Sequence, residues 1–297
     1  MQPARHTPGV EPRTISTPDL DIACLEAGEG PLALCLHGFP DTARTWRHLL
    51  PRLADAGFHA VAPFNRGYAP TAVPADGFFQ AGALAADANA LHEALGAGDD
   101  AVVIGHDWGA AAAYGAAGSA PDRWRQVVGL AVPPSNAMLL TFLGYEQLKL
   151  SWYMHFFQSP LAEMLVVADD LAFLDRLWHD WSPGYDPTDD LGAAKDALRS
   201  PEHLTAALGI YRAALGNAPL SPALTTEQAA CGDAPPQPTL YLHGEDDGCI
   251  AAATAGSAAG AFDRVGSRFD VLAGVGHFLH LETPDRVNDL IIDFLTG

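Results

Sequence analysis

The chain has 297 residues, 48% of them hydrophobic, and its formal net charge is −20. Lys and Arg together number only 16, so nucleic acids and anionic membranes are poor partners. No apolar run reaches the roughly 18 residues of a membrane span, and the polar N-terminus lacks the apolar core of a signal peptide. The cysteines have no metal-type spacing, which predicts reduced thiols and a cytoplasmic location. They are Cys24, Cys35, Cys231 and Cys249.

Short apolar runs alternate with helical segments through the first part of the chain, which predicts a mostly parallel α/β sheet. Gly28-Glu29-Gly30 separates the first two runs and predicts a hairpin between them. Asp41 is expected to cap the N-terminus of a helix that continues to Ala54, and a second helix is predicted over 81–95. The predicted strands of this part are 21–27, 31–36, 58–62, 101–105 and 126–132.

The pattern then changes to aromatic and helical segments divided by Ser-Pro breaks. We interpret this stretch, 135–231, as a helical cap inserted into one core domain made of 1–134 and 232–297. The chain returns to the sheet after several prolines, and Pro284 opens a final amphipathic helix. The last two predicted strands are 239–243 and 269–272.

The stretch 101–109 carries the most informative motif of the sequence. The apolar strand 101–105 ends in Gly105-His106-Asp107-Trp108-Gly109, which leads into a run of Ala and Gly. This stretch matches the nucleophile elbow, a sharp strand-to-helix turn, with Asp107 where the elbow pattern has serine. Two further chemically capable residues, Asp247 and His277, follow later strands. Because ligands of open α/β sheets bind beyond the carboxyl ends of the strands, we expect the three side chains to meet there.

With its order of nucleophile, acid and histidine, the sequence resembles α/β-hydrolases with an aspartate nucleophile, and within them the soluble epoxide hydrolases. The resemblance covers about Thr14 to Leu295. It implies the α/β-hydrolase fold, a mostly parallel central sheet flanked by helices, with an inserted helical cap. The motifs that carry it are His37-Gly38-Phe39-Pro40, Gly105-His106-Asp107-Trp108-Gly109, Gly244-Glu245-Asp246-Asp247 and Gly276-His277-Phe278.

Two cap segments extend the resemblance. The stretch 152–160 is similar to the segment that carries the first cap tyrosine of epoxide hydrolases, and 210–212 is similar to the segment that carries the second. The resemblance implies that the phenols of Tyr153 and Tyr211 hold the epoxide oxygen above Asp107. Four other cap aromatics could line an apolar pocket or could only hold the cap together. They are Trp152, Phe156, Trp178 and Trp181.

The loop after the second predicted strand and the elbow together are expected to supply an oxyanion hole. Backbone N–H groups of Phe39 and Trp108 would stabilise the oxyanion. His37 and Gly38 are expected to support this loop together with Pro40. Such loops in the resembled family tend to hold a cis proline, so we predict that the Phe39–Pro40 peptide bond is cis.

The chemistry of an aspartate nucleophile follows from its charge. A carboxylate is ionised at neutral pH, because its ordinary pKa is about 3.9, so Asp107 needs no base. Its attack on an sp³ carbon gives an alkyl ester, which water activated by His277 can hydrolyse, with Asp247 orienting the imidazole. An opened epoxide also needs a proton, which a tyrosine can donate. The sequence therefore predicts a cofactor-independent, metal-free hydrolase of a small apolar or aromatic epoxide.

Other interpretations remain open at this stage. A haloalkane dehalogenase also has Asp-Trp-Gly at the elbow, and its halide needs two N–H donors. Trp108 could be one donor and a cap tryptophan the other, but Phe39 stands where dehalogenases usually have Asn. A catalytically silent binding protein on the hydrolase fold is the second alternative. Asp246 could also replace Asp247 as the acid.

Overall fold

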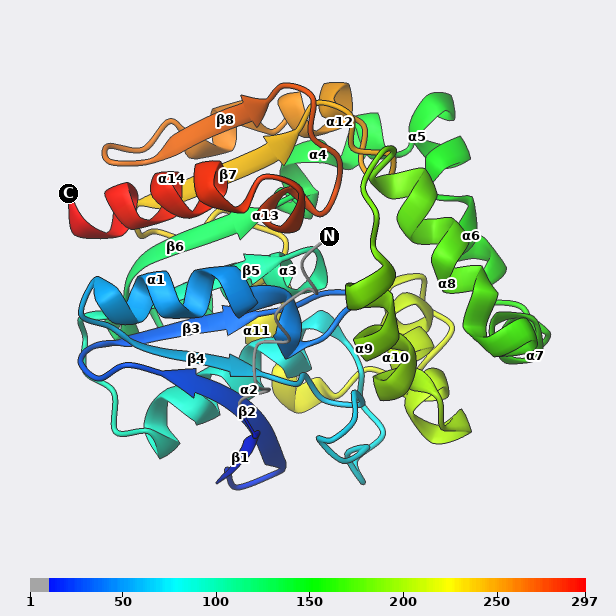
Figure 1. Ribbon diagram of the computed structural model, residues 1–297, viewed down its shortest axis with the longest axis horizontal. Coiled ribbons are helices and arrows are strands. Elements are labelled where there is room, and N and C mark those ends of the chain that lie inside the picture. The colour runs from blue at the N-terminus through cyan, green and yellow to red at the C-terminus, as the bar shows by residue number, and fades with distance from the viewer. Residues whose placement is uncertain (1–10) are drawn as a thin grey trace, which may run out of the picture.

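The computed structural model describes residues 11–297, and its centre is one eight-stranded sheet (Figure 1). The strands lie in the order β1-β2-β4-β3-β5-β6-β7-β8. β1 pairs antiparallel with β2, and β2 with β4, whereas the remaining neighbours are parallel. The strands are β1 (Arg13–Ser16), β2 (Asp21–Ala27), β3 (Leu32–Leu36), β4 (His59–Pro63), β5 (Ala101–His106), β6 (Trp124–Leu130), β7 (Thr239–Gly244) and β8 (Arg268–Leu272).

The central strands are buried along their whole length. All six residues of β5 are buried, and β3 and β6 flank it in parallel register. Continuous apolar runs are what a parallel strand covered on both faces requires. The mostly parallel sheet predicted from the sequence is therefore confirmed.

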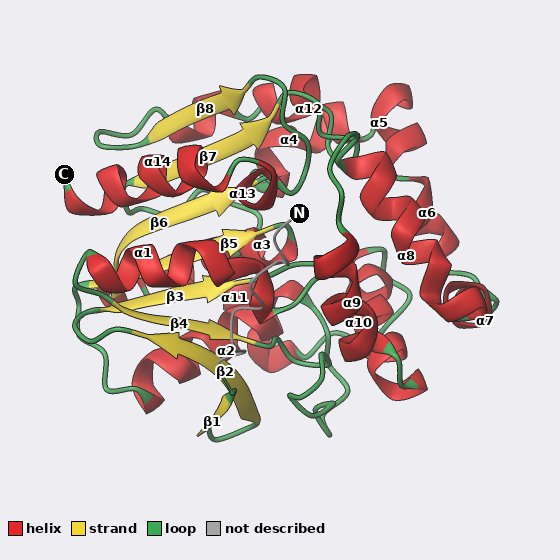
Figure 2. Cartoon of the chain, in the orientation of Figure 1, coloured by secondary structure: helices red, strands yellow, loops and turns green. Residues whose placement is uncertain are grey.

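Helices cover both faces of the sheet (Figure 2). α2, α3 and α11 pack against one another on one face, and α1 and α14 pack together on the other. The Ala and Gly run of α3 allows close approach, since a Cβ added at Gly115 would lie 2.4 Å from the Sγ of Cys231. These helices are α1 (Leu49–Asp55), α2 (Ala81–Ala94), α3 (Trp108–Ser119), α11 (Thr225–Ala230) and α14 (Pro284–Thr296).

Helices α4 to α10 lie between β6 and β7 in the chain, and we call them the helical insertion. Most of them gather beside the sheet, at the end toward which the arrowheads of the parallel strands point (Figure 1). We propose that this insertion is the predicted cap, with a boundary before Thr225, because α11 packs on the core helices. The helices are α4 (Ser135–Phe142), α5 (Tyr145–Leu150), α6 (Trp152–Phe156), α7 (Ala162–Val166), α8 (Ala168–Trp181), α9 (Thr188–Leu198) and α10 (Pro201–Ala214). Two short helices, α12 (Ala252–Gly256) and α13 (Leu279–Glu282), follow β7 and β8.

Two local predictions differ from the structure, and one strand was not predicted. β2 and β3 do not form a hairpin, because β4 lies between them in the sheet. Their connecting loop instead packs against the turn before β4, where a Cβ added at Gly30 would lie 2.1 Å from the carbonyl oxygen of Gly57. β1 was not predicted. The helix expected from Asp41 begins as a 3₁₀ helix at Ala43, and Thr42 rather than Asp41 caps it.

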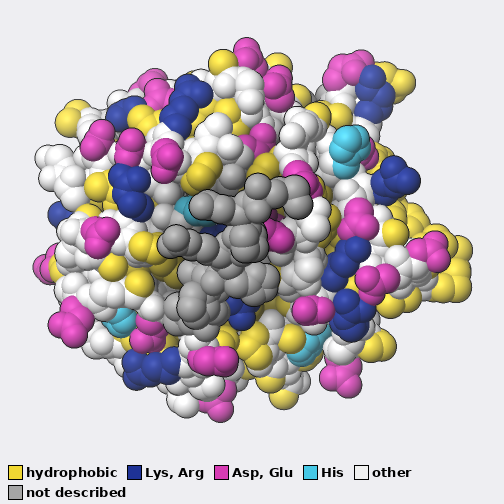
Figure 3. Space-filling view, in the orientation of Figure 1, with side chains coloured by type: hydrophobic (Ala, Val, Ile, Leu, Met, Phe, Trp, Pro, Cys, Tyr) yellow, Lys and Arg dark blue, Asp and Glu magenta, His cyan; other side chains and the backbone are white. Residues whose placement is uncertain are grey.

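The acidic character is spread over the surface. Asp and Glu side chains are scattered across the face in Figure 3, whereas hydrophobic side chains gather over α7. Leu161, Met164 and Leu165 are among the exposed residues of this patch. Among residues 11–297, no helix combines the length and the apolarity needed to cross a membrane.

Candidate active site

Asp107 stands at the sharp turn between β5 and α3. Its backbone φ is +54°, in the left-handed region that residues other than glycine rarely adopt. Both flanking glycines are required by close contacts. A Cβ added at Gly105 would lie 2.1 Å from the carbonyl oxygen of Gly109, and one added at Gly109 would lie 2.1 Å from that of Leu36. The structure therefore has the strand-to-helix turn that the sequence predicted, with Asp107 at its apex.

The loop after β3 supplies hydrogen-bond donors to this aspartate. The backbone N–H of Phe39 donates to Asp107 Oδ1 at 2.8 Å, and the backbone N–H of Trp108 acts with it to lower the pKa of the carboxyl group. The loop can come this close to the aspartate only because residue 38 is glycine. A Cβ added at Gly38 would lie 2.3 Å from Asp107 Oδ1. The peptide bond between Phe39 and Pro40 is cis, as predicted.

His37 stabilises the same loop through hydrogen bonds to its backbone and to Asn65. Its Nε2 accepts the backbone N–H of Asn65 at 3.0 Å, so the ring proton sits on Nδ1 and donates to the carbonyl oxygen of Gly38 at 2.8 Å. The amide of Asn65 donates in turn to the His37 carbonyl oxygen at 2.6 Å. Burial lowers the pKa of His37 to about 4, so the ring is neutral at neutral pH.

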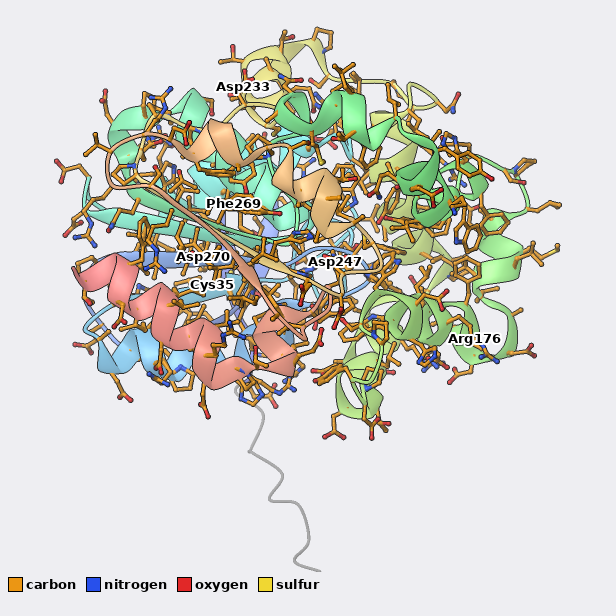
Figure 4. All side chains as sticks on the ribbon, turned by 90° about the horizontal axis from the view of Figure 1, so that it is seen from above. Cys35, Arg176, Asp233, Asp247, Phe269 and Asp270 are labelled. Atoms are coloured by element: carbon orange, nitrogen blue, oxygen red, sulfur yellow. The ribbon has the colours of Figure 1, made fainter. Side chains whose placement is uncertain are left out.

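His277 and Asp247 meet at the carboxyl ends of the strands. His277 Nδ1 lies 2.9 Å from Asp247 Oδ2. Asp247 Oδ1 accepts the backbone N–H groups of Cys249 at 2.7 Å and Ile250 at 2.9 Å. Figure 4 shows Asp247 at the end of the sheet that faces the helical insertion. Its neighbour Asp246 is exposed, so the geometry favours Asp247 as the partner of the histidine.

The other ring nitrogen of His277 faces the nucleophile candidate. His277 Nε2 lies 3.8 Å from Asp107 Oδ2 and has no hydrogen-bond partner among the described residues. Burial raises the pKa of Asp107, although His277 and two backbone N–H groups oppose the rise. Burial by itself lowers the pKa of His277, but the charges of Asp247 and Asp107 outweigh it, and the pKa is raised overall. The arrangement therefore favours a protonated imidazole between two carboxylates.

Tyr153 of α6 and Tyr211 of α10 converge on the same place. Their rings meet edge to face with centroids 5.7 Å apart, and both side chains are buried. Burial raises the pKa of both phenols, and the charge of Asp107 adds to the rise, so both stay protonated at neutral pH. The Tyr211 hydroxyl has no hydrogen-bond partner among residues 11–297. The Trp108 side chain, whose ring centroid lies 5.3 Å from that of Tyr211, lowers the pKa of this phenol.

The other insertion aromatics have different surroundings. Trp178 stacks on Phe278 with centroids 3.6 Å apart, and its indole N–H donates to the Pro40 carbonyl oxygen at 3.1 Å. These contacts favour a bracing role over a pocket-lining one. Phe156 stacks on Phe173 inside the insertion.

Trp181 lies closer to the reacting groups. Its ring meets that of His277 edge-on, with centroids 5.2 Å apart. With Trp152 it also lines a cavity of about 430 Å³, which is separate from the reacting groups because neither Asp107 nor His277 lines it. Trp152 is 46% exposed. Of the four predicted pocket aromatics, Trp181 therefore has the position best suited to contact a ligand.

Comparisons with known proteins agree with this geometry. Residues 31–284 match the family described as alpha/beta hydrolase fold. Epoxide hydrolase 4 of Mus musculus is 30% identical over 283 residues, which are 92% of this chain and 75% of that protein. An epoxide hydrolase of Caballeronia sordidicola is 42% identical over 128 residues, 43% of this chain and 39% of that protein. The chain belongs to the epoxide hydrolase family of alpha/beta hydrolases.

A solved structure in this family has the same architecture. The epoxide hydrolase from an endophytic Streptomyces superposes with a TM-score of 0.77 at 29% identity, covering 98% of this chain and 96% of that one. The α/β-hydrolase fold expected from the sequence is therefore confirmed.

Sequence reasoning missed one structural element of this alpha/beta hydrolase. The segment 180–182, which we call the strap, runs from the insertion across the loops of the acid and the histidine. The carbonyl oxygen of Trp181 accepts the backbone N–H groups of Gly248 at 3.1 Å and His277 at 3.0 Å. In the sequence, the Ser182 region stood out only as a break between helices. No local pattern indicates its contact with loops so distant in the chain.

Sequence reasoning also missed Cys249. Its Sγ lies 3.2 Å from the Tyr153 hydroxyl, inside the site of this epoxide hydrolase family member. The only signal was its position two residues after Asp247, since a loop that carries the acid also carries its neighbours to the site.

A second buried group lies next to the elbow. Asp41, His106 and His280 place ligand-type atoms within 4.8 Å of one another. His106 Nε2 lies 3.0 Å from the carbonyl oxygen of His277, and His280 Nε2 lies 2.6 Å from the hydroxyl oxygen of Thr45. Burial lowers the pKa of both histidines well below the usual range. Their contacts favour a structural role for both histidines.

Proposed function

We propose that this protein adds water to a small apolar or aromatic epoxide and releases a vicinal diol through a covalent Asp107 ester. The observation that carries the proposal is the pair of buried, protonated phenols of Tyr153 and Tyr211. Both lie close enough to Asp107 for its negative charge to raise their pKa. The names of the relatives support the same substrate class. Neither chemical step needs a cofactor, and a cytoplasmic location stays a prediction from the sequence.

In the first step, Asp107 Oδ2 attacks an epoxide carbon and the carbon–oxygen bond breaks. Oδ1 is held by the Phe39 N–H, which leaves Oδ2 to react. The epoxide oxygen becomes an alkoxide that accepts a hydrogen bond and then a proton from Tyr153 or Tyr211. The resulting phenolate regains a proton from the His277 imidazolium, which leaves the imidazole neutral for the second step. Because the phenols retain their protons at neutral pH, they are suited to this donation.

In the second step, water attacks the carbonyl carbon of the ester. Ester formation removes the charge of Asp107, one of the groups that raise the pKa of His277. The imidazole therefore becomes easier to deprotonate when a base is needed, while Asp247 keeps it oriented. The N–H groups of Phe39 and Trp108 stabilise the oxyanion on Oδ1. Water leaves its oxygen on the aspartate, and the former Oδ2 departs in the diol.

Halide chemistry has weaker support in this site. A leaving halide needs two N–H donors, and the Trp178 indole N–H already donates to Pro40. Trp152 is half exposed, and Phe39 brings no polar side chain. The phenols, which can donate a proton as well as a hydrogen bond, suit an epoxide oxygen better than a halide.

The proposal is tested by product analysis over a panel of aromatic and aliphatic epoxides, with haloalkanes in parallel and Asp107→Asn as the inactive control. We expect diol formation from at least one epoxide and none from the control. Halide release from haloalkanes with no diol from any epoxide would establish the dehalogenase alternative. Tight ligand binding without turnover of either class would favour a silent binding protein.

A further inference from the structure

The Cys249 thiol faces both reacting side chains of the site. Its Sγ, a carboxylate oxygen of Asp107 and a ring nitrogen of His277 all lie within 4.8 Å of one another, and all three residues are buried. His277 Nε2 is fully buried and has no hydrogen-bond partner among the described residues. A thiol, an imidazole nitrogen and a carboxylate therefore converge on one small volume.

We propose that Asp107, Cys249 and His277 form a binding site for a divalent cation of borderline-soft character, with Zn²⁺ as the best match. Thiolate, imidazole and carboxylate are the three ligand types that zinc takes in proteins, and three protein ligands leave a fourth position for water. The other nitrogen of His277 is held by Asp247 at 2.9 Å. A carboxylate behind a ligating histidine is the usual support of such a metal ligand.

The negative charges around the thiol favour the binding of a divalent cation. Burial raises the pKa of Cys249, and the carboxylates of Asp247 and Asp107 raise it further, so the thiol is protonated in the free protein. A dication is attracted by the same two carboxylates. On binding, it takes the sulfur as thiolate and Nε2 of His277 as the neutral imidazole nitrogen, so the thiol proton and the imidazolium proton both leave to solvent. The Tyr153 hydroxyl, 3.2 Å from Sγ, is placed to donate to that thiolate.

Binding at this position has a direct consequence for the chemistry. The cation would occupy the nucleophilic carboxylate and the Nε2 that activates water, so it would inhibit both steps. The site is therefore inhibitory, and Cys249 makes the enzyme sensitive to Zn²⁺. The inhibition of turnover rests on the proposed function. The binding of the cation does not depend on it.

The described residues contain one other cluster with metal-ligand spacing, made of Asp41, His106 and His280. It contains no sulfur. A probe that reports a metal–sulfur bond therefore distinguishes the two clusters, and Co²⁺ provides one through its thiolate-to-metal charge-transfer absorption.

The first experiment measures binding without turnover. Purified, EDTA-treated protein is titrated with Co²⁺ and its near-ultraviolet absorption is recorded for wild type, Cys249→Ser and Cys249→Ala. Cys231→Ala is the matched control, because Cys231 is also buried but lies at the end of α11, beside Gly115 of α3. We expect a charge-transfer band in wild type and the control that is lost in both Cys249 variants and displaced by Zn²⁺. A wild-type protein without the band, or Cys249 variants that keep it, would overturn the proposal.

The second experiment measures inhibition of epoxide turnover by Zn²⁺. We expect micromolar inhibition that EDTA reverses, and a midpoint at least about tenfold higher in Cys249→Ser than in wild type or Cys231→Ala. Equal midpoints in all three proteins would also contradict the proposed site. If no epoxide is turned over, the proposed function fails, whereas the cobalt band still decides the metal site.

Discussion

The backbone N–H of Phe39 donates to Asp107 Oδ1 at 2.8 Å, which fixes one carboxylate oxygen and leaves the other free. The two residues come from different loops, one after β3 and one after β5, which are neighbouring strands of the sheet. Gly38 permits the contact, because any side chain there would overlap Asp107. Parallel strand order and one small residue thus set the orientation of the nucleophile.

Gly38→Ala is expected to lower kcat by about 10²–10³, because the added Cβ pushes the Phe39 N–H away from Asp107 and removes one oxyanion donor. Gly192→Ala in α9 is the matched control, since a Cβ there meets open space. Steady-state kinetics of both variants check this. Wild-type kcat in a folded Gly38→Ala protein would show that the donor is not needed.

Tyr153→Phe and Tyr211→Phe are each expected to lower epoxide turnover by about 10²–10³, or about 2.7–4 kcal/mol. Each change removes a donor to the developing alkoxide with little change in shape. The double variant should be worse than either single one but less than additive, because the donors act as a unit. The melting temperature is the control for folding. Turnover within a few-fold of wild type in both variants would mean that the phenols are misassigned.

His277→Gln is expected to accumulate the ester, because Asp107 attacks without a base but the water step needs one. Intact-mass measurement after incubation with substrate should show the protein plus one substrate molecule. Peptide mapping should place the adduct on Asp107. A variant that turns over normally would remove His277 from the mechanism. A variant with neither adduct nor turnover would place His277 in the first step as well.

Asp247→Asn is expected to slow the water step by on the order of 10⁴, the loss that the same change causes in Ser-His-Asp triads. Asp246→Asn is the matched control, because Asp246 is an exposed neighbour of the same charge. Single-turnover kinetics of ester decay compare the two. If Asp246→Asn were the more damaging change, the acid would have to be reassigned.

Asp107→Asn is expected to abolish turnover and to keep or raise the melting temperature at about pH 7. The folded-state pKa of Asp107 is raised mainly by burial, so the folded protein binds this proton more tightly than the unfolded chain. The stability that this group contributes is present below the unfolded pKa of about 3.9 and is lost as pH rises through the folded pKa. The amide side chain of the Asp107→Asn variant does not ionise, so the variant does not lose stability as the pH rises.

Thermal unfolding as a function of pH checks this linkage. The advantage of Asp107→Asn should be largest at neutral pH and shrink as the pH approaches the ordinary pKa of aspartate. A variant clearly less stable than wild type at neutral pH would show that the carboxylate contributes more through its hydrogen bonds than it costs through burial.

The sequence predicted those features that local chemistry determines. The elbow, the parallel strands and the motif loops depend on glycines and apolar runs that are readable one segment at a time. The predicted hairpin failed for the opposite reason. Gly28 and Gly30 look like turn residues, but they serve close packing against the turn before β4, and strand pairing is a long-range property.

Side-chain partners across the fold were harder to predict. Asp246 and Asp247 are adjacent in sequence, and only the path of the loop shows which of them is buried beside His277. The environment of Cys249 likewise depends on where α6 places Tyr153. Resemblance to a family could indicate the phenols, whereas the only signal for this thiol was its position two residues after Asp247.

The strap, 180–182, also bears on how such enzymes can be altered. Its Trp181 carbonyl oxygen and Ser182 hydroxyl bind the backbone on either side of the histidine, and a Cβ added at Gly248 would lie 1.9 Å from the Asp180 carbonyl oxygen. A chimaera that exchanged the whole insertion for that of a relative would remove these bonds and release the loops they hold. New substrate ranges are therefore more accessible by substitutions in α6 or α10, with the strap left in place.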